Sequence, residues 1–131
     1  VDCTFMSQRE ALEKIKKLEP SIIGVYSMFS MKQSALEIAR QLRSNCRLLV
    51  AGGPLPTLCP EDFLEDFDVV AVGEGEKTML ELVETVRDGR SLSAVKGIVY
   101  RDKQGNPEPA VMHTPSRELI GDLDKLIFLF R

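Results

Sequence analysis

Short uncharged runs alternate with amphipathic stretches along the first two thirds of the chain. The runs at 21–27, 48–51 and 69–72 have the length of strands and lack the strict polar–apolar alternation of a half-exposed sheet. Each run stops at small or glycine-rich residues, most clearly at Gly52-Gly53-Pro54. Apolar strands of this kind are buried on both faces, which is typical of a parallel sheet.

The stretches between these runs have the pattern of amphipathic helices. Ser7-Gln8-Arg9-Glu10 is a capping box, and the helix that it begins is expected to end at Pro20. Further helices are predicted at 32–44, at 61–65 as a short helix, and at 77–87, where Gly89 has the position of a C′ residue.

The order helix, strand, helix, strand, short helix, strand, helix predicts an α/β fold with a parallel sheet and right-handed crossovers. After residue 91 the pattern changes, because 95–101 alternates with a period of two and 102–106 has the composition of a turn. With 109–114 as the returning strand, this part is predicted to be a β-hairpin, followed by a surface linker at 115–124. The chain thus divides into an α/β part, 1–91, and a hairpin with linker, 92–131.

Composition narrows the function classes. Hydrophobic residues make up 44% and charged residues 28%, and the net charge of −3 with no Trp disfavours nucleic acid as a partner. We expect no membrane span, because no apolar run approaches the roughly 20 residues that a bilayer requires. The three cysteines, Cys3, Cys46 and Cys59, form no C-x-x-C pair, so we expect reduced thiols in a cytoplasmic protein rather than a metal site.

Candidate catalytic groups are few. The single histidine, His113, lies in a proline-flanked segment and offers no Ser–His–Asp arrangement. Glu74 and Glu76 are paired carboxylates that either remain solvated and bonded to nearby amides or contact a bound ligand. Gly73-x-Gly75-x-x-Thr78 matches only part of the dinucleotide fingerprint, and its two acids would repel a pyrophosphate. We therefore assign no catalytic residue and no metal ligand.

The ends of the three predicted strands are the strongest functional signal. The segments 27–30, 52–57 and 73–76 are rich in small residues, and the carboxyl ends of parallel strands meet at one edge of the sheet. Each glycine alone can be explained as a turn residue. Together the three segments predict a broad rim that suits a large, flat or long ligand.

These residues resemble the cobalamin-binding domain that precedes the catalytic core of B12-type radical SAM proteins, a group that includes the anaerobic magnesium-protoporphyrin IX monomethyl ester oxidative cyclases. The resemblance covers nearly the whole chain. The matching segments are Ile23-Gly24-Val25-Tyr26-Ser27, Val50-Ala51-Gly52-Gly53-Pro54, Asp68-Val69-Val70-Ala71-Val72-Gly73-Glu74-Gly75-Glu76-Lys77-Thr78, Val95-Lys96-Gly97-Ile98-Val99-Tyr100-Arg101 and the linker-like Asp122-Leu123-Asp124-Lys125-Leu126.

The resemblance implies a flavodoxin-like, Rossmann-like sheet that lacks its first strand, and a cobalamin whose nucleotide tail enters at the strand ends. The partner that it implies is a radical SAM core in the same protein, which carries a [4Fe-4S] iron–sulfur cluster and S-adenosyl-L-methionine and acts on an unknown small-molecule substrate by methyl transfer or oxidative cyclisation. The implied cofactor-binding residues are Ser27, Met28, Gly52, Gly53, Pro54, Thr57, Gly73, Glu74 and Gly75, with Phe29 and Met31 as further apolar contacts to the corrin.

Two features of the family pattern are absent from this sequence. It has no Asp-x-His-x-x-Gly loop and no C-x-x-x-C-x-x-C cluster motif, so we expect no imidazole ligand to cobalt and no radical chemistry from this chain itself. The ends, without an initiator Met and with the apolar run 126–130, indicate a piece of a longer protein. A missing first strand would leave the edge of the strand 22–26 open to dimerisation or to that apolar run. The alternative function is a docking or substrate-recognition domain that has lost cobalamin.

Overall fold

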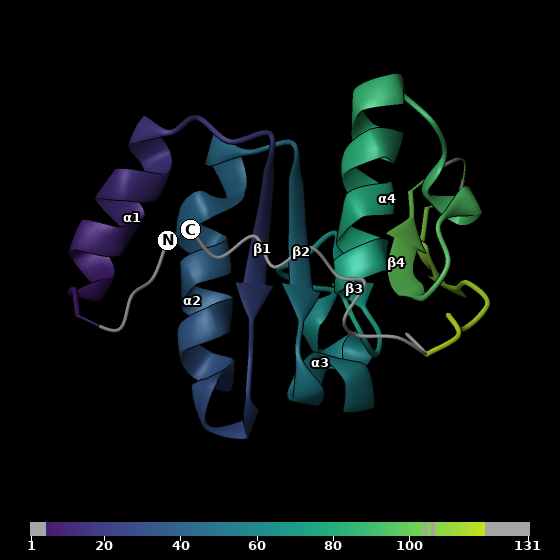
Figure 1. Ribbon diagram of the computed structural model, residues 1–131, viewed down its shortest axis with the longest axis horizontal. Coiled ribbons are helices and arrows are strands. Elements are labelled where there is room, and N and C mark those ends of the chain that lie inside the picture. Colours follow the sequence, from purple (N-terminus) through teal and green to yellow (C-terminus); the bar gives the residue numbers. More distant parts are fainter. Residues whose placement is uncertain (1–4, 104, 106, 120–131) are drawn as a thin grey trace.

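The computed structural model describes residues 5–103, 105 and 107–119, which form one mixed sheet of five strands with helices on both faces (Figure 1). The spatial order of the strands follows their order in the chain. The strands are β1 (Ile22–Tyr26), β2 (Leu48–Gly52), β3 (Val69–Ala71), β4 (Ile98–Asp102) and β5 (Ala110–His113).

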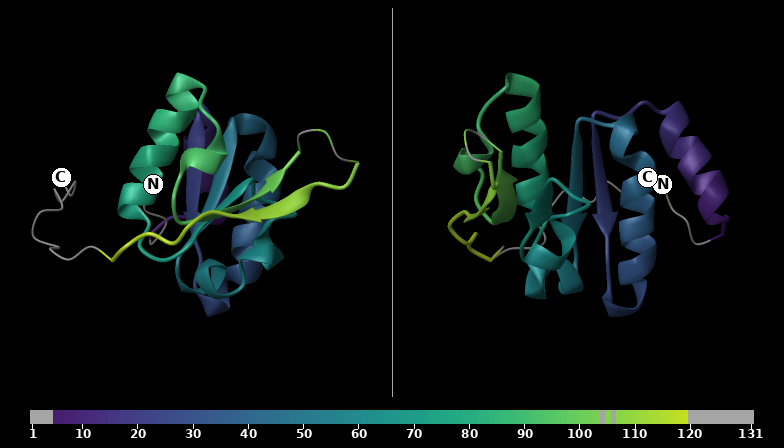
Figure 2. Two further views of the ribbon diagram at one scale, coloured as in Figure 1. Left: turned by 90° about the vertical axis from the view of Figure 1, so that its right-hand side faces the viewer. Right: turned by 180° about the vertical axis from the view of Figure 1, so that it is seen from behind.

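The first three strands are parallel, and the last two reverse direction. In the β1–β2 pair, Ile22 lies opposite Leu48 and Tyr26 opposite Gly52, so these two strands end at the same level. β4 runs antiparallel to β3 and β5 antiparallel to β4. The predicted α/β fold with a C-terminal hairpin is confirmed, and the hairpin continues the main sheet. Figure 2 shows that the β4–β5 ribbon extends away from the helical layers.

The helices confirm the local signals of the sequence. Ser7 and Glu10 form both hydrogen bonds of the capping box, and Gly89 ends the last helix in the left-handed conformation. The α-helices are α1 (Gln8–Lys17), α2 (Lys32–Leu42), α3 (Pro54–Leu58) and α4 (Glu76–Asp88), and the 3-10 turns are η1 (Phe29–Met31), η2 (Arg43–Asn45), η3 (Pro60–Phe63) and η4 (Leu92–Ala94).

Each face of the sheet has its own core. One core joins alternate strand residues such as Leu49 and Val70 to α2, α3 and the buried ring of Phe63, and α1 packs against the outer side of α2 (Figure 1). The other core joins Val50 and its neighbours on the opposite face to α4 and to Leu92 and Val95, which follow that helix. On this face the buried residues of β3 and β4 pack with those of α4, while β1 lies to the left of the helix (Figure 1).

Three element boundaries differ from the prediction. The segment 54–58, expected as loop, is helix α3, because Pro54 and Pro56 lie in its first turn, where a proline costs no intrahelical hydrogen bond. The short helix expected at 61–65 is the 3-10 turn η3. The strand expected at 95–101 begins only at Ile98, because Gly97 has φ 73° and interrupts the extended backbone.

The segment that follows β5 is fastened to the sheet and to α4. The Gly97 amide donates to the Pro115 carbonyl at 2.9 Å. Arg117, whose side chain is only 18% exposed, donates to the Thr78 hydroxyl and to the Lys96 carbonyl and forms an ion pair with Glu81. We call this set of contacts the Arg117 clamp. The predicted linker thus begins with an ordered segment that lies against α4.

Replacing Arg117 by alanine is expected to lower the free energy of unfolding by about 2 kcal/mol, because three partly buried groups lose their donor. Arg87→Ala is the matched control, since Arg87 is 69% exposed and pairs only with its neighbour Asp88. The control should leave the free energy of unfolding nearly unchanged, because water screens an exposed ion pair. Denaturant unfolding curves of both variants measure the difference. Equal unfolding midpoints for the two variants would show that the Arg117 clamp does not stabilise the fold.

Several predicted features fall outside the described residues. These are Val1–Thr4, the linker-like segment 122–126 and the apolar run 126–130. Among the described strands only β2 pairs with β1, which places β1 at one end of the sheet as described. None of the helices that the described residues form is both long and apolar enough to cross a lipid bilayer.

Candidate functional site

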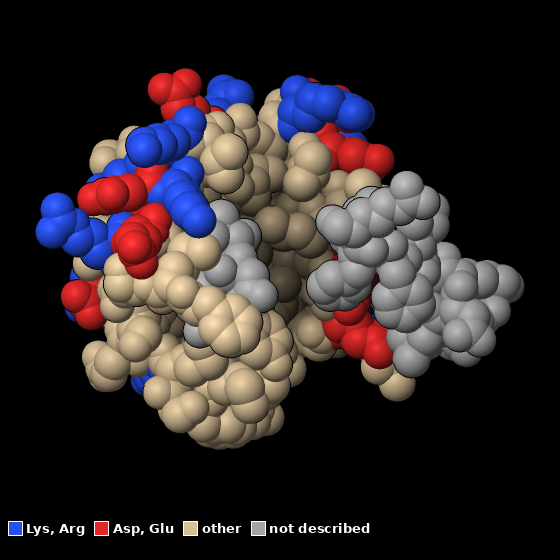
Figure 3. All heavy atoms as spheres, turned by 60° about the vertical axis from the view of Figure 1, so that its left-hand side comes forward, with Lys and Arg blue, Asp and Glu red and all other residues tan. Residues whose placement is uncertain are grey.

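The carboxyl ends of β1, β2 and β3 surround a pocket of about 640 Å³, which we call the strand-end pocket. It lies between the exposed face of β1 and β2 and the first turns of α4, and Figure 3 shows a hollow in this face whose walls are mostly uncharged. Its lining residues are Gly24, Val25, Tyr26, Val50, Gly52, Gly53, Pro54, Thr57, Ala71, Gly73, Glu74, Gly75, Glu76 and Met79.

Seven of the nine residues expected at the cofactor site line this pocket: Gly52, Gly53, Pro54, Thr57, Gly73, Glu74 and Gly75. The structure brings them together because parallel strands deliver their following loops to one edge of the sheet. They form two walls, one from the loop after β2 together with α3, and one from the loop between β3 and α4.

Three glycines leave open space in these walls. A Cβ atom placed on Gly52, Gly73 or Gly75 would meet no atom within 4 Å, so the space beside each backbone is free for a ligand. Gly73 also has φ 79°, a conformation that other residues rarely adopt. The pocket is thus a cradle that side chains at these positions would fill.

At Gly53, the backbone conformation and the close packing of the neighbouring loop require glycine. It has φ 108° and ψ −176° at the start of α3, and a Cβ atom there would lie 2.7 Å from the Ser27 carbonyl oxygen and 3.0 Å from the Tyr26 ring. The loop after β1 therefore packs directly on the Gly53 backbone. This glycine shapes the fold of the site as well as lining it.

A hydrogen bond joins the two walls. The Gly73 amide donates to the Thr57 hydroxyl at 3.0 Å, which ties α3 to the loop after β3. Sequence reasoning placed Thr57 at the site but did not foresee this bond, because the two residues belong to different crossovers. The bond fixes the spacing of the walls at this point.

Ser27 and Met28, the other two expected residues, do not line the pocket. Ser27 is fully buried, its amide donates to the Gly52 carbonyl, and its hydroxyl donates to the Met28 carbonyl. Met28 is exposed beside the strand ends. It belongs to an apolar rim, which we define as the exposed side chains Tyr26, Met28, Phe29, Met31 and Leu58.

The floor of the pocket was missed by the sequence analysis. Gly24 and Val50 lie opposite each other on β1 and β2, on the face that α4 covers only in part. Met79 approaches them from α4, so that its terminal methyl lies 3.0 Å from the position of a Cβ on Gly24. The period of two along each strand is the signal that relates Gly24 to Tyr26 and Val50 to Gly52.

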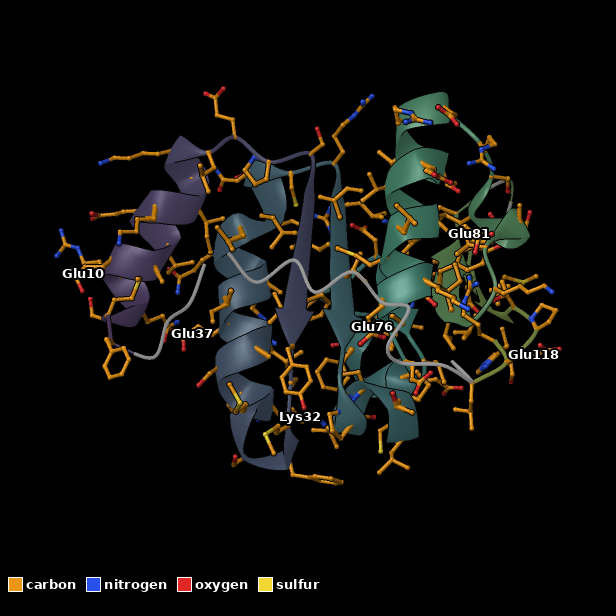
Figure 4. The ribbon with its side chains drawn as sticks, viewed as in Figure 1. Glu10, Lys32, Glu37, Glu76, Glu81 and Glu118 are labelled. Carbon is orange, nitrogen blue, oxygen red and sulfur yellow. The ribbon has the colours of Figure 1, made fainter. Side chains whose placement is uncertain are left out.

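The charged groups of the site are acids. Glu74 and Glu76 both line the pocket, and Glu76 begins α4, where Figure 4 shows it beside the strands. A carboxylate at this place complements the positive end of the helix. Among the described residues, no group of three or more His, Cys, Asp or Glu side chains could hold a metal ion.

The remaining reactive side chains lie apart from the pocket. His113 is exposed on β5, and its Nε2 is 3.8 Å from a carboxylate oxygen of Glu61. Cys46 and Cys59 are free cysteines, and burial raises the pKa of the Cys46 thiol, which keeps it protonated and unreactive near neutral pH. The polar side chains that line the pocket are Tyr26, Thr57, Glu74 and Glu76, which can hydrogen-bond to a ligand and position it.

Comparison with known protein families identifies the family to which the chain belongs. The family described as "B12 binding domain" matches residues 1–83, which is more than half of the chain.

Individual relatives agree with this match. An uncharacterized methyltransferase of Pyrococcus horikoshii is 33% identical over 118 residues, which cover 86% of this chain and 24% of the relative. The anaerobic magnesium-protoporphyrin IX monomethyl ester cyclase of Rubrivivax gelatinosus is 31% identical over 130 residues, which cover 92% of this chain and 22% of the relative.

A solved structure has the same fold. The cobalamin-dependent S-adenosylmethionine radical enzyme OxsB, with aqua-cobalamin and S-adenosylmethionine bound, superposes with a TM-score of 0.74 at 25% identity, over 86% of this chain and 16% of that protein. The chain therefore spans a quarter or less of the length of each of these three proteins.

Proposed function

Because the chain belongs to the B12-binding domain family, we propose that it binds cobalamin in the strand-end pocket and presents it to a radical SAM core of the same protein. The observation that carries this proposal is the cradle at the strand ends, where Gly52, Gly73 and Gly75 leave open space on two facing walls. A volume of about 640 Å³ is sufficient for a group of the size of a nucleotide.

Each wall contributes in its own way. Gly52, Gly53, Pro54 and Thr57 hold one side of the nucleotide tail, and Gly73, Glu74 and Gly75 hold the other. Ser27 is buried and contributes indirectly. Its hydrogen bonds to the Gly52 and Met28 carbonyls hold the loop that follows β1 in place. Once bound, cobalamin supplies the methyl-carrier or redox chemistry, while the protein supplies binding and orientation.

The apolar rim is suited to contact the corrin ring of cobalamin. A corrin ring is broad, and its edge carries many methyl and methylene groups. Met28, Phe29 and Met31 offer exposed, adaptable apolar surface beside the mouth of the pocket. In Figure 3 the lobe at the lower left of the hollow is almost entirely uncharged, which suits a large apolar contact, while acidic side chains lie at the lower right.

The partner follows from the relatives. OxsB is a radical enzyme that uses both cobalamin and S-adenosylmethionine, and this chain matches only a small part of it. We infer that the remaining part of the present protein carries a [4Fe-4S] cluster and S-adenosylmethionine, and that the reaction is methyl transfer or oxidative cyclisation. The chain itself then has no catalytic residue.

Titration of the intact protein with hydroxocobalamin tests the proposal. Binding should change the visible absorption spectrum of the cofactor, and the complex should retain one cobalamin per chain after gel filtration. A protein that emerges colourless, with an unchanged spectrum throughout the titration, would contradict cobalamin binding.

A docking or substrate-recognition domain without cofactor is the second candidate. The observation in its favour is the apolar rim, since five large exposed side chains at and after the ends of β1 and β2 could equally contact another protein surface. The same titration separates the two functions, because only the docking function predicts a folded protein that binds no corrinoid.

His113 is expected not to ligate cobalt, because it is on β5, lies near Glu61 and does not line the pocket. In the cobalamin-loaded intact protein, His113→Ala should leave the paramagnetic resonance spectrum of the Co(II) form unchanged. Loss of nitrogen hyperfine splitting in the variant would assign this histidine as a ligand.

A further inference from the structure

The inner end of the strand-end pocket differs in chemistry from its mouth. The polar side chains of the lining are Tyr26 at the end of β1, Thr57 in α3, Glu74 in the loop before α4 and Glu76 at the first residue of α4. The floor consists of apolar residues, Gly24, Val50 and Ala71 from the strands and Met79 from the first turn of α4. A ligand group that reaches the floor contacts apolar residues and no longer contacts the polar side chains at the mouth.

The backbone of the floor has little to offer a ligand. Gly24 pairs with Val50 in the parallel ladder, and Val50 pairs in turn with Val69 of β3, so the amides and carbonyls of this region serve the sheet. The Thr57 hydroxyl already accepts a hydrogen bond from the Gly73 amide. Polar atoms of a ligand would find few partners at this depth.

Met79 closes the inner end. Its terminal methyl lies 3.0 Å from the position that a Cβ on Gly24 would take, so the side chain reaches from α4 to β1 across the floor. A thioether is unbranched and polarisable, and it can adjust to the face or edge of an aromatic ring. Gly24 provides the space into which this side chain extends.

We propose that this floor makes the domain selective for the lower base of the corrinoid, with Gly24 and Met79 as the residues that determine the preference. This inference rests on the proposed function. Dimethylbenzimidazole would bury a benzene ring and two methyl groups against the floor. Adenine carries an amino group and two ring nitrogens at the corresponding edge, and each would lose its water without gaining a partner.

Three corrinoids test the preference in the intact protein: hydroxocobalamin, its analogue with an adenine base, and cobinamide, which lacks the nucleotide tail. We expect hydroxocobalamin to bind about tenfold or more tightly than the adenine analogue, since one unpaired buried polar group has an effect of that size. Cobinamide should bind more weakly than either. Equilibrium titration followed by absorbance measures all three affinities.

The possible outcomes distinguish a failure of the proposed base preference from a failure of cobalamin binding itself. Equal affinity for the two bases overturns the selectivity and leaves cobalamin binding intact. Cobinamide binding as tightly as hydroxocobalamin also overturns it, because the tail would then not reach the floor. If none of the three corrinoids binds, the proposed function itself fails.

Variants of the floor provide the second test. Met79→Gln adds an amide that can pair with adenine, and it should reduce the preference to about threefold or less. Leu80→Gln is the matched control on the same helix, because Leu80 is 61% exposed and does not line the pocket, and it should keep the full preference. If Met79→Gln leaves the ratio of the two affinities unchanged, Met79 does not determine the base preference.

Gly24→Ala covers the case in which Met79→Gln does not fold. Its added methyl would displace the flexible end of Met79 and narrow the floor, while the strand backbone accepts alanine without strain. Both tailed corrinoids should then bind more weakly, and the affinity for cobinamide should stay the same. Equal weakening of all three would indicate a general loss of structure and would overturn the role of Gly24.

Discussion

Replacing Gly53 by valine will unfold or severely destabilise the domain, with an expected loss of about 3 kcal/mol or more in the free energy of unfolding. Gly53 has φ 108° and ψ −176°, a region that is essentially restricted to glycine. The new Cβ would also lie 2.7 Å from the Ser27 carbonyl oxygen, which is part of the backbone and cannot turn aside.

Thermal and denaturant unfolding of the variant measure this loss. Gly89→Ala is a useful comparison, because Gly89 also has a positive φ, 65°, but a Cβ there would meet no atom within 4 Å. It should lose only about 1 kcal/mol, the strain of the left-handed conformation alone. If both variants lose the same amount, the contact with Ser27 has no energetic importance.

Replacing Gly52 by valine should have the opposite profile: cobalamin binding falls by about a hundredfold or more, while the fold survives. A Cβ on Gly52 meets no atom within 4 Å, and its backbone is an ordinary strand conformation in which valine is favourable. The branched side chain would instead occupy the space of the pocket. A methyl-sized overlap with a well-fitted ligand already costs about 1–3 kcal/mol, and valine adds three such carbons.

Corrinoid titration and an unfolding curve on the same sample measure the two effects together. Gly24→Ala lies nearby in the sheet and adds only one carbon, so its loss of affinity should be smaller. Full affinity in Gly52→Val would show that the ligand does not use this wall, and the site would have to be sought at the apolar rim alone.

The sequence predicted most of the fold, because its signals are local. The capping box at Ser7 and Glu10 and the left-handed Gly89 are each decided by a few neighbouring residues. Helix α3 was missed because Pro54 and Pro56 are typical of loops, and only their place in the first turn makes them compatible with a helix.

The rim of the site was predictable for a topological reason. Once three parallel strands are recognised, their carboxyl ends must meet, and the glycines that follow them are brought to one edge. The floor was not predictable in this way. The contact between Gly24 and Met79 depends on how α4 lies across the sheet, and the burial of Ser27 depends on the direction of one side chain.

Helix α4 takes part in two sets of contacts at once. Its first turn carries Met79 on the floor of the pocket, and Thr78 and Glu81 hold the Arg117 clamp beside it. Arg117 is therefore fastened to the same helix that lines the pocket. If a bound ligand displaced α4, the segment at Arg117 would have to follow or the clamp would have to break. Binding in the pocket and the strength of the clamp would then be coupled, and each would change the other by the same free energy.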